Sequence, residues 1–167
     1  GLPDFQEKTD VKLIQSLEEL LGQVETDMTI FYRRLANLPV DLAITKDNRW
    51  LDYLIDCYYQ PEQLTEKHLA AMSKWLTLYL KRLIAAKTDF SQRKERMDNT
   101  NPKYVLRNYL AQQAIELAEQ GDFSMLHRLQ KVLKNPYDEQ SEFEHLAKKR
   151  PEWARHKAGC SMLSCSS

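Results

Sequence analysis

Hydrophobic side chains recur every three or four positions along most of this chain, which is the spacing of one face of an α-helix. The first stretch follows Thr9 or Asp10, either of which can cap a helix. Its apolar face consists of Val11, Ile14, Leu17 and Leu21. In chain order, the pattern predicts helices over about residues 10–21, 24–38, 47–60, 65–87, 89–100, 101–120, 122–134 and 141–149.

The longest predicted helix, over about 65–87, has a strongly apolar face. The residues that share this face are His68, Met72, Trp75, Tyr79 and Leu83. A histidine in such a setting is more often a hydrogen-bonded core imidazole than a metal or substrate ligand, so we expect His68 to be structural.

A strong helix start is predicted at Asn101-Pro102, because Asn can cap a helix and Pro fits its first position. The residues that follow are apolar nearly all round, which predicts a largely buried, central helix. Arg107 and Asn108 interrupt this apolar surface. Since a buried Arg needs a partner, we expect both to join a structural polar network rather than a ligand site. Gly121 would end the helix in a left-handed conformation.

The composition supports an all-α fold, an irregular multi-helix bundle. The chain has 24 Leu against 5 Val and 6 Ile, and only 4 Gly among 167 residues. Unbranched side chains keep their rotamers in helices, whereas sandwiches and barrels use many β-branched residues and turn glycines. No glycine-rich phosphate-binding motif is present. We expect one helical domain over 1–150 and an irregular tail over 151–167 that contains cysteines.

The charges balance, with 24 Lys and Arg against 24 Asp and Glu. This excludes a generally basic nucleic-acid-binding protein. Residues 1–30 nevertheless hold seven acids and two bases, and residues 81–107 hold eight bases and three acids. The basic stretch could dock an acidic partner, or it could be a solvated helix face. No apolar run approaches the ~20 residues that cross a bilayer, so we expect no membrane contact.

Three cysteines are too few, and an odd number, for a disulfide-stapled fold, which favours a reducing compartment such as the cytoplasm. Cys160 and Cys165 lie in a small, Ser-rich segment, where a thiol would be accessible to oxidants. They are therefore redox candidates, although an inert tail is equally compatible with the sequence. Cys57, on an apolar helix face, is expected to be buried.

A zinc site in the tail is the remaining metal hypothesis. His145, His156, Cys160 and Cys165 supply ligands of the right kind. Their spacings are loose and no C-x-x-C pair occurs, so we expect no metal site.

Five segments resemble the C-terminal portion of the bacterial selenoprotein O family. The longest is Asn-Pro-Lys-Tyr-Val-Leu-Arg-Asn-Tyr-Leu-Ala at 101–111. Gly-Asp-Phe at 121–123, Asn-Pro-Tyr at 135–137, Phe-Tyr-Arg-Arg-Leu at 31–35 and the ending Cys-Ser-Ser at 165–167 fit the same family. The resemblance extends over essentially the whole chain. Together with the missing initiator Met, it suggests a piece of a longer enzyme.

The resemblance implies a protein adenylyltransferase with a kinase-like fold. Such enzymes use ATP with Mg²⁺ or Mn²⁺ and transfer AMP to Ser, Thr or Tyr hydroxyls of other proteins. The catalytic and nucleotide-binding residues would belong to an upstream kinase-like portion, which this chain would extend as helices of its helical lobe. The chain alone is then expected to be inactive, its partners being that upstream portion and, for the whole enzyme, the protein substrates.

The resemblance also singles out Cys165, because animal members carry selenocysteine at the third position from the end. A disulfide from Cys165 or Cys160 to the catalytic portion could tether the tail and alter access to the active site. The competing hypothesis is a self-contained helical interaction module without a part in catalysis.

Overall fold

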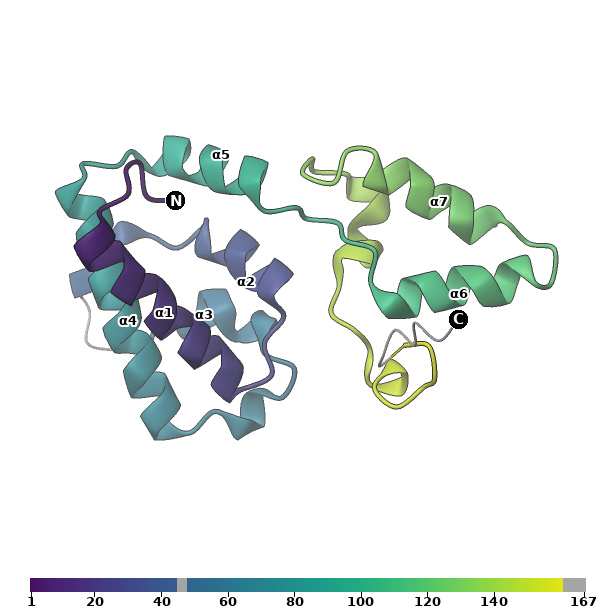
Figure 1. Ribbon diagram of the computed structural model, residues 1–167, viewed down its shortest axis with the longest axis horizontal. Coiled ribbons are helices and arrows are strands. Elements are labelled where there is room, and N and C mark those ends of the chain that lie inside the picture. Colours follow the sequence, from purple (N-terminus) through teal and green to yellow (C-terminus); the bar gives the residue numbers. More distant parts are fainter. Residues whose placement is uncertain (45–47, 161–167) are drawn as a thin grey trace. The chain divides into compact units, whose positions relative to one another are not determined.

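The chain folds into helices and connecting turns, seen in a computed structural model that describes residues 1–44 and 48–160 (Figure 1). No strand forms among these residues, only an isolated bridge between Thr26 and Tyr58. The predicted all-α class is therefore confirmed. Two compact units divide the chain, unit 1 at Gly1–Asn101 and unit 2 from Pro102 onward. The boundary falls within the range 1–150 that the helical pattern treats as one domain.

Unit 1 contains five α-helices that are joined by short 3₁₀ turns. They are α1 (Glu7–Gln23), α2 (Met28–Leu35), α3 (Leu51–Leu54), α4 (Glu66–Ala85) and α5 (Phe90–Thr100), with turns at Val40–Ile44, Ile55–Cys57 and Pro61–Gln63. Three of the helices begin at a residue whose side-chain oxygen accepts a backbone N–H of the first turn. These capping residues are Asp27 for α2, Thr65 for α4 and Asp89 for α5.

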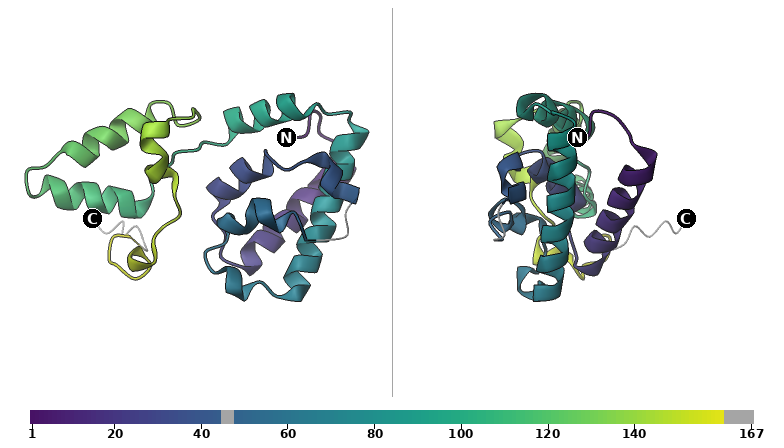
Figure 2. Two further views of the ribbon diagram at one scale, coloured as in Figure 1. Left: turned by 180° about the vertical axis from the view of Figure 1, so that it is seen from behind. Right: turned by 90° about the vertical axis from the view of Figure 1, so that its left-hand side faces the viewer.

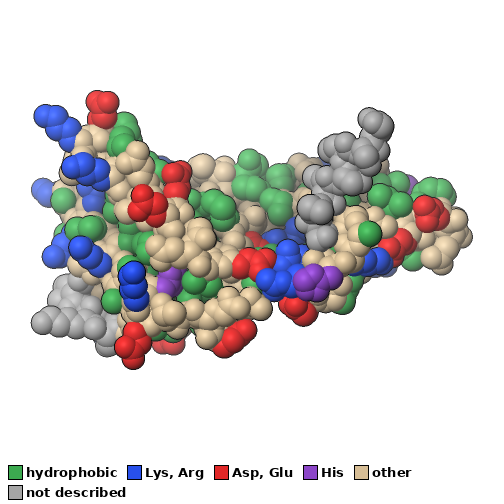
Figure 3. Space-filling model, turned by 60° about the horizontal axis from the view of Figure 1, so that its bottom comes forward, with side chains coloured by type: hydrophobic (Ala, Val, Ile, Leu, Met, Phe, Trp, Pro, Cys, Tyr) green, Lys and Arg blue, Asp and Glu red, His purple; other side chains and the backbone are tan. Residues whose placement is uncertain are grey.

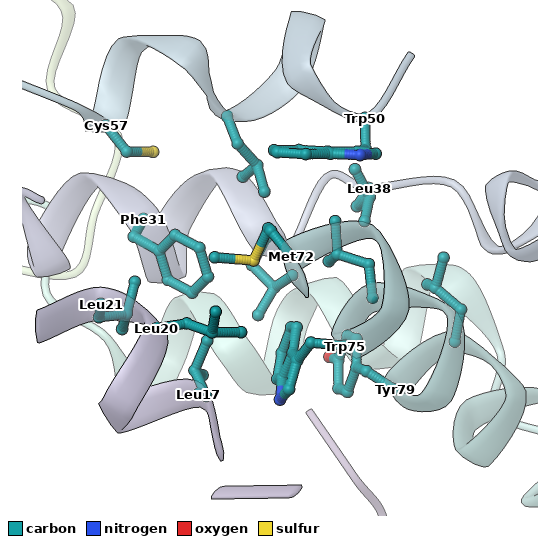
Figure 4. Close-up of a cluster of buried hydrophobic side chains, with 14 of the residues drawn as sticks. Leu17, Leu20, Leu21, Phe31, Leu38, Trp50, Cys57, Met72, Trp75 and Tyr79 are labelled. Carbon is teal, nitrogen blue, oxygen red and sulfur yellow. The ribbon is translucent and has the colours of Figure 1, made fainter. Parts of the chain in front are cut away.

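The core of unit 1 lies between α1, α2 and α4 (Figure 4). Phe31 of α2 and Met72 of α4 are completely buried, and Leu20 of α1 packs in the same cluster. The predicted apolar face of α4 is confirmed, since all five of its residues are buried. The predicted face of α1 is partly wrong. Ile14 is 47% exposed, because the buried stripe of α1 passes through Asp10, Leu17, Leu20 and Leu21 and leaves Ile14 outside it.

Unit 2 is built on two α-helices and the segment that follows them. The helices are α6 (Asn108–Ala118) and α7 (Ser124–Leu133), with 3₁₀ turns at Ser141–Ala147 and Glu152–Ala154. A second core joins both helices to Phe143, Leu146 and Ala154 of these turns. Within residues 151–160, Ala154 and Cys160 are buried in this core, and only Glu152–Ala154 forms a 3₁₀ turn; the predicted boundary at residue 150 stays a prediction.

The predicted helix start at Asn101-Pro102 is wrong. Asn101 instead closes α5, where its side-chain Nδ2 donates to the Met97 carbonyl at 2.8 Å. The backbone N–H groups of the next residues, Lys103 and Tyr104, both donate to the Pro136 carbonyl, at 2.8 and 3.0 Å. These tertiary hydrogen bonds hold the segment away from a helical conformation, and α6 starts only at Asn108.

The expected burial of α6 on all sides is also wrong, because Ile115 is 52% exposed. Its predicted end is confirmed: Gly121 has φ +82°, and the N–H groups of Gly121 and Asp122 donate to the carbonyls of Ala118 and Leu117. This double hydrogen bond is the Schellman arrangement, which requires a left-handed residue.

Candidate functional site

The two redox candidates have different outcomes. Cys165 lies outside the described residues. Cys160 is only 3% exposed and packs in the core of unit 2, so the expectation of an accessible thiol is wrong for this residue. The reason is a local turn: the Cys160 N–H donates to the Lys157 carbonyl at 3.1 Å, and Gly159 before it has φ +79°. Cys57 is buried in unit 1, as predicted.

Arg107 and Asn108 lie at the start of α6, and both are half-buried. The Arg107 carbonyl accepts the N–H groups of Leu110 and Ala111 at 2.9 and 3.1 Å, so Arg107 occupies the N-cap position. The structural polar network remains a prediction for these two side chains.

The proposed tail ligands do not form a described metal centre. Within residues 1–44 and 48–160, no three His, Cys, Asp or Glu side chains gather closely enough to hold a metal ion. His145 and His156 are exposed, and Cys165 is outside this range.

His68 is a buried histidine with hydrogen-bond partners, as predicted. Its Nε2 lies 3.4 Å from the Tyr58 hydroxyl, and its Nδ1 lies 3.4 Å from Gln23 Oε1. Burial disfavours the charged ring and lowers the pKa of His68. Burial likewise raises the pKa of Tyr58. The cluster ties α4 to the end of α1 and the turn after α3.

A buried ion pair joins the other end of α1 to α4. Asp10 is 1% exposed, and its Oδ1 accepts Arg82 Nε at 3.1 Å. Its other oxygen accepts the Gln6 N–H at 2.8 Å, which satisfies a free donor at the helix start. Arg82 also donates to the Asp4 carbonyl at 2.9 Å. The pair explains why α1 begins before the predicted caps.

A second buried cation, Arg93, belongs to α5. Arg93 has no exposed surface, and its Nη2 donates to the carbonyls of Ala36 and Leu38 at 3.0 and 2.5 Å. Its guanidinium also stacks against the Phe90 ring, 5.1 Å from the ring centroid. Arg93 therefore satisfies the free carbonyls after α2 and attaches α5 to that end.

A groove of about 720 Å³ runs along unit 1 between α1 and α4. The two helices lie side by side in both views of Figure 2. The floor of the groove is apolar and consists of Leu13, Leu20, Ala71, Trp75 and Leu78. The floor is fixed in place, because Trp75 Nε1 donates to the Leu13 carbonyl at 2.8 Å. Trp75 also stacks on Tyr79 with the ring centroids 5.2 Å apart.

Basic side chains border this groove. Lys8 and Lys12 come from α1, one helical turn apart, and Lys74 comes from α4. All three are exposed, and none forms an ion pair with any described residue. Lys and Arg side chains alternate with hydrophobic ones on the left-hand part of the face in Figure 3, which belongs to unit 1. The groove is not visible in the sequence, because two helices that are far apart along the chain, α1 and α4, form it together.

Comparison with known proteins gives these features a family context. The family described as protein adenylyltransferase SelO matches residues 1–134. The chain is 46% identical over 177 residues to protein nucleotidyltransferase YdiU of Rhodopirellula baltica, with 100% of this chain and 32% of the relative covered. For the YdiU protein of Tolumonas auensis, the identity is 48% over 161 residues, with 95% and 29% covered.

Both relatives carry the name protein nucleotidyltransferase. The chain belongs to the protein adenylyltransferase SelO family, and it spans about a third of the length of the curated relatives it matches. The predicted resemblance to this family is thus confirmed, whereas the position of the chain within the longer relatives stays a prediction. None of the helices in the described ranges combines the length and apolar character that a membrane span requires.

Proposed function

We propose that this chain is a helical part of an ATP-dependent protein adenylyltransferase that transfers AMP to Ser, Thr or Tyr hydroxyls of other proteins. The observation that carries the proposal is membership of the SelO family over most of the chain, at 46% identity to a protein nucleotidyltransferase. Its position at the carboxyl end of that enzyme, next to a kinase-like catalytic portion, is part of the same proposal.

In this proposal the chain supports the enzyme structurally. Its buried charges connect elements of unit 1: Asp10 pairs with Arg82 across α1 and α4, and Arg93 holds α5 to the end of α2. The described side chains offer no set of carboxylates that fits a divalent cation. In this proposal, the upstream portion of the enzyme would hold ATP and Mg²⁺ or Mn²⁺.

In this proposal Cys165 is the redox-responsive residue. Cys160 does not have this role, because its thiol is buried. A disulfide between Cys165 and a thiol of the catalytic portion would form by exchange with an oxidised low-molecular-weight disulfide. The latter is reduced to two thiols in the process. The tether would regulate access to the active site rather than carry out the transfer.

Transfer of labelled AMP from ATP to a mixture of proteins tests the proposal. We expect incorporation with the full-length enzyme, none with this chain alone, and strong loss when the segment is removed from the full-length enzyme. Transfer by the chain alone would contradict the structural role. Undiminished transfer by an enzyme without the segment would favour the alternative, a helical interaction module with no part in catalysis.

A further inference from the structure

The groove between α1 and α4 combines three features that suit a docking site. It is large, at about 720 Å³, and its floor is apolar. Leu78, which also lines the groove, remains 52% exposed in a unit that has a well-filled core. Three lysines without ion-pair partners in the described chain border it. We propose that this groove is a docking site for an acidic amphipathic helix of a partner protein.

The dimensions and lining fit a helix. The groove is lined by α1 from Lys8 to Gln23, which corresponds to roughly 22 Å at 1.5 Å per residue. A partner helix of about four turns would cover this length and insert apolar side chains spaced three and four apart. The floor supplies apolar contacts along both walls, from Leu13 and Leu20 on α1 and from Ala71, Trp75 and Leu78 on α4.

The charges select an acidic partner. Lys8, Lys12 and Lys74 present ammonium groups whose charge no described carboxylate neutralises. Arg82 also lines the groove, but its guanidinium is already paired with Asp10. Glu19 is the other acid on the lining. Acidic side chains beside the apolar anchors of a docked helix would meet the lysines, whereas a basic helix would meet three like charges.

The groove is also preorganised, which reduces the entropy that binding must overcome. The Trp75 hydrogen bond to the Leu13 carbonyl and the buried Asp10–Arg82 pair hold its two walls together. This proposal does not depend on AMP transfer, since it concerns only the surface of unit 1.

The test uses the 167-residue chain and a synthetic helical peptide of about fifteen residues. The peptide carries Leu at positions i, i+3, i+4 and i+7 and Glu on the flanking positions; a matched peptide carries Lys in place of Glu. Fluorescence anisotropy is expected to show micromolar binding of the acidic peptide, at least about tenfold tighter than the Lys peptide. High salt is expected to weaken it.

Charge-reversal variants locate the binding. The triple change Lys8→Glu, Lys12→Glu and Lys74→Glu should weaken the acidic peptide by about tenfold or more, and Leu78→Asp should also weaken it. The control triple carries the same charge change at exposed lysines outside the groove: Lys67→Glu, Lys81→Glu and Lys134→Glu. We expect less than about a threefold effect from it, with unchanged circular dichroism in every variant.

Several outcomes would overturn the proposal. Equal weakening by both triples would show that the groove is not the site, and equal binding of the two peptides would remove the charge selection. No binding of the acidic peptide, together with binding of phosphatidylglycerol vesicles through the same lysines, would assign the groove to a lipid surface instead.

Discussion

The two units of this chain place their charges differently. In unit 1, Asp10, Asp27, His68 and Arg93 are buried. Unit 2 has no charged side chain among its described buried residues. The side chains of Lys103 and Arg155 are only 16% and 22% exposed in their ion pairs, whereas other pairs of this unit lie at the surface. Lys131 and Glu142, for example, pair at 3.0 Å with 65% and 70% of their side chains exposed.

This difference indicates how each unit is held together. In unit 1, the charged groups join segments that are distant in sequence, such as Asp10 and Arg82, which are 72 positions apart. Removing the Asp10 carboxylate would leave the largely buried Arg82 charge with only the exposed Asp4 carboxylate, 3.4 Å away, as compensation. In unit 2, water solvates an exposed pair such as Lys131 and Glu142, so this pair contributes little stability. Equivalent substitutions should therefore have unequal effects.

The largest expected effect is that of Asp10→Asn. The amide keeps the shape of the side chain but leaves the Arg82 guanidinium, with only 11% of its side chain exposed, without its buried carboxylate. We expect the free energy of unfolding of unit 1 to fall by about 3 kcal/mol. Native-state hydrogen exchange of the α1 and α4 amides measures this change while unit 2 serves as an internal reference.

The matched control for this change is Glu142→Gln in unit 2. It also replaces one carboxylate of an ion pair by an amide, but at an exposed pair. A loss of less than about 1 kcal/mol is expected. Similar losses in the two variants would remove the contrast between buried and surface pairs.

The next effect is a pH dependence in unit 1. Because burial lowers the pKa of His68, the unfolded chain binds this proton more readily than the folded chain. Stability therefore rises with pH between the lowered pKa and the ordinary value of about 6.5, and is lost on acidification through that window. The slope is at most about 1.4 kcal/mol per pH unit for one proton.

Urea unfolding between about pH 7 and about pH 5 checks this sign. His68→Gln should flatten the slope, because an amide can hydrogen-bond without titrating. His127→Gln, at an exposed histidine of unit 2, should leave it unchanged. An unaltered slope in the His68 variant would assign the pH dependence to other groups.

Local spacing in the sequence was sufficient for α4 and for the ends of some helices, although it placed Ile14 wrongly on the buried face of α1. The face of α4 from His68 to Leu83 follows from helical periodicity alone, and Thr65 and Gly121 act at the ends of their helices as local rules require. Prediction from the sequence failed where a group distant along the chain determined the local conformation. Asn101-Pro102 has the composition of a helix start, yet Lys103 and Tyr104 donate to the Pro136 carbonyl instead.

The candidate sites show the same limit. The segment around Cys160 is small and polar, which suggested exposure, but packing against the core of unit 2 buries the thiol. The groove could not be predicted at all. Its lysine spacing on α1 is visible in the sequence, but its apolar floor exists only because α4 lies beside α1.

The smallest expected effects come from two glycines, one in each unit. Gly121 has φ +82° with open space around it, so Gly121→Ala costs only the left-handed conformation, about 1 kcal/mol.

Gly22, near the end of α1, also has open space, and no positive φ. There Ala restricts the unfolded chain and should stabilise by about 0.5 to 1 kcal/mol. Hydrogen exchange should show a loss confined to unit 2 for the first variant and a gain confined to unit 1 for the second. If either variant changed the exchange rates in both units, on both sides of Asn101, the two units would unfold together.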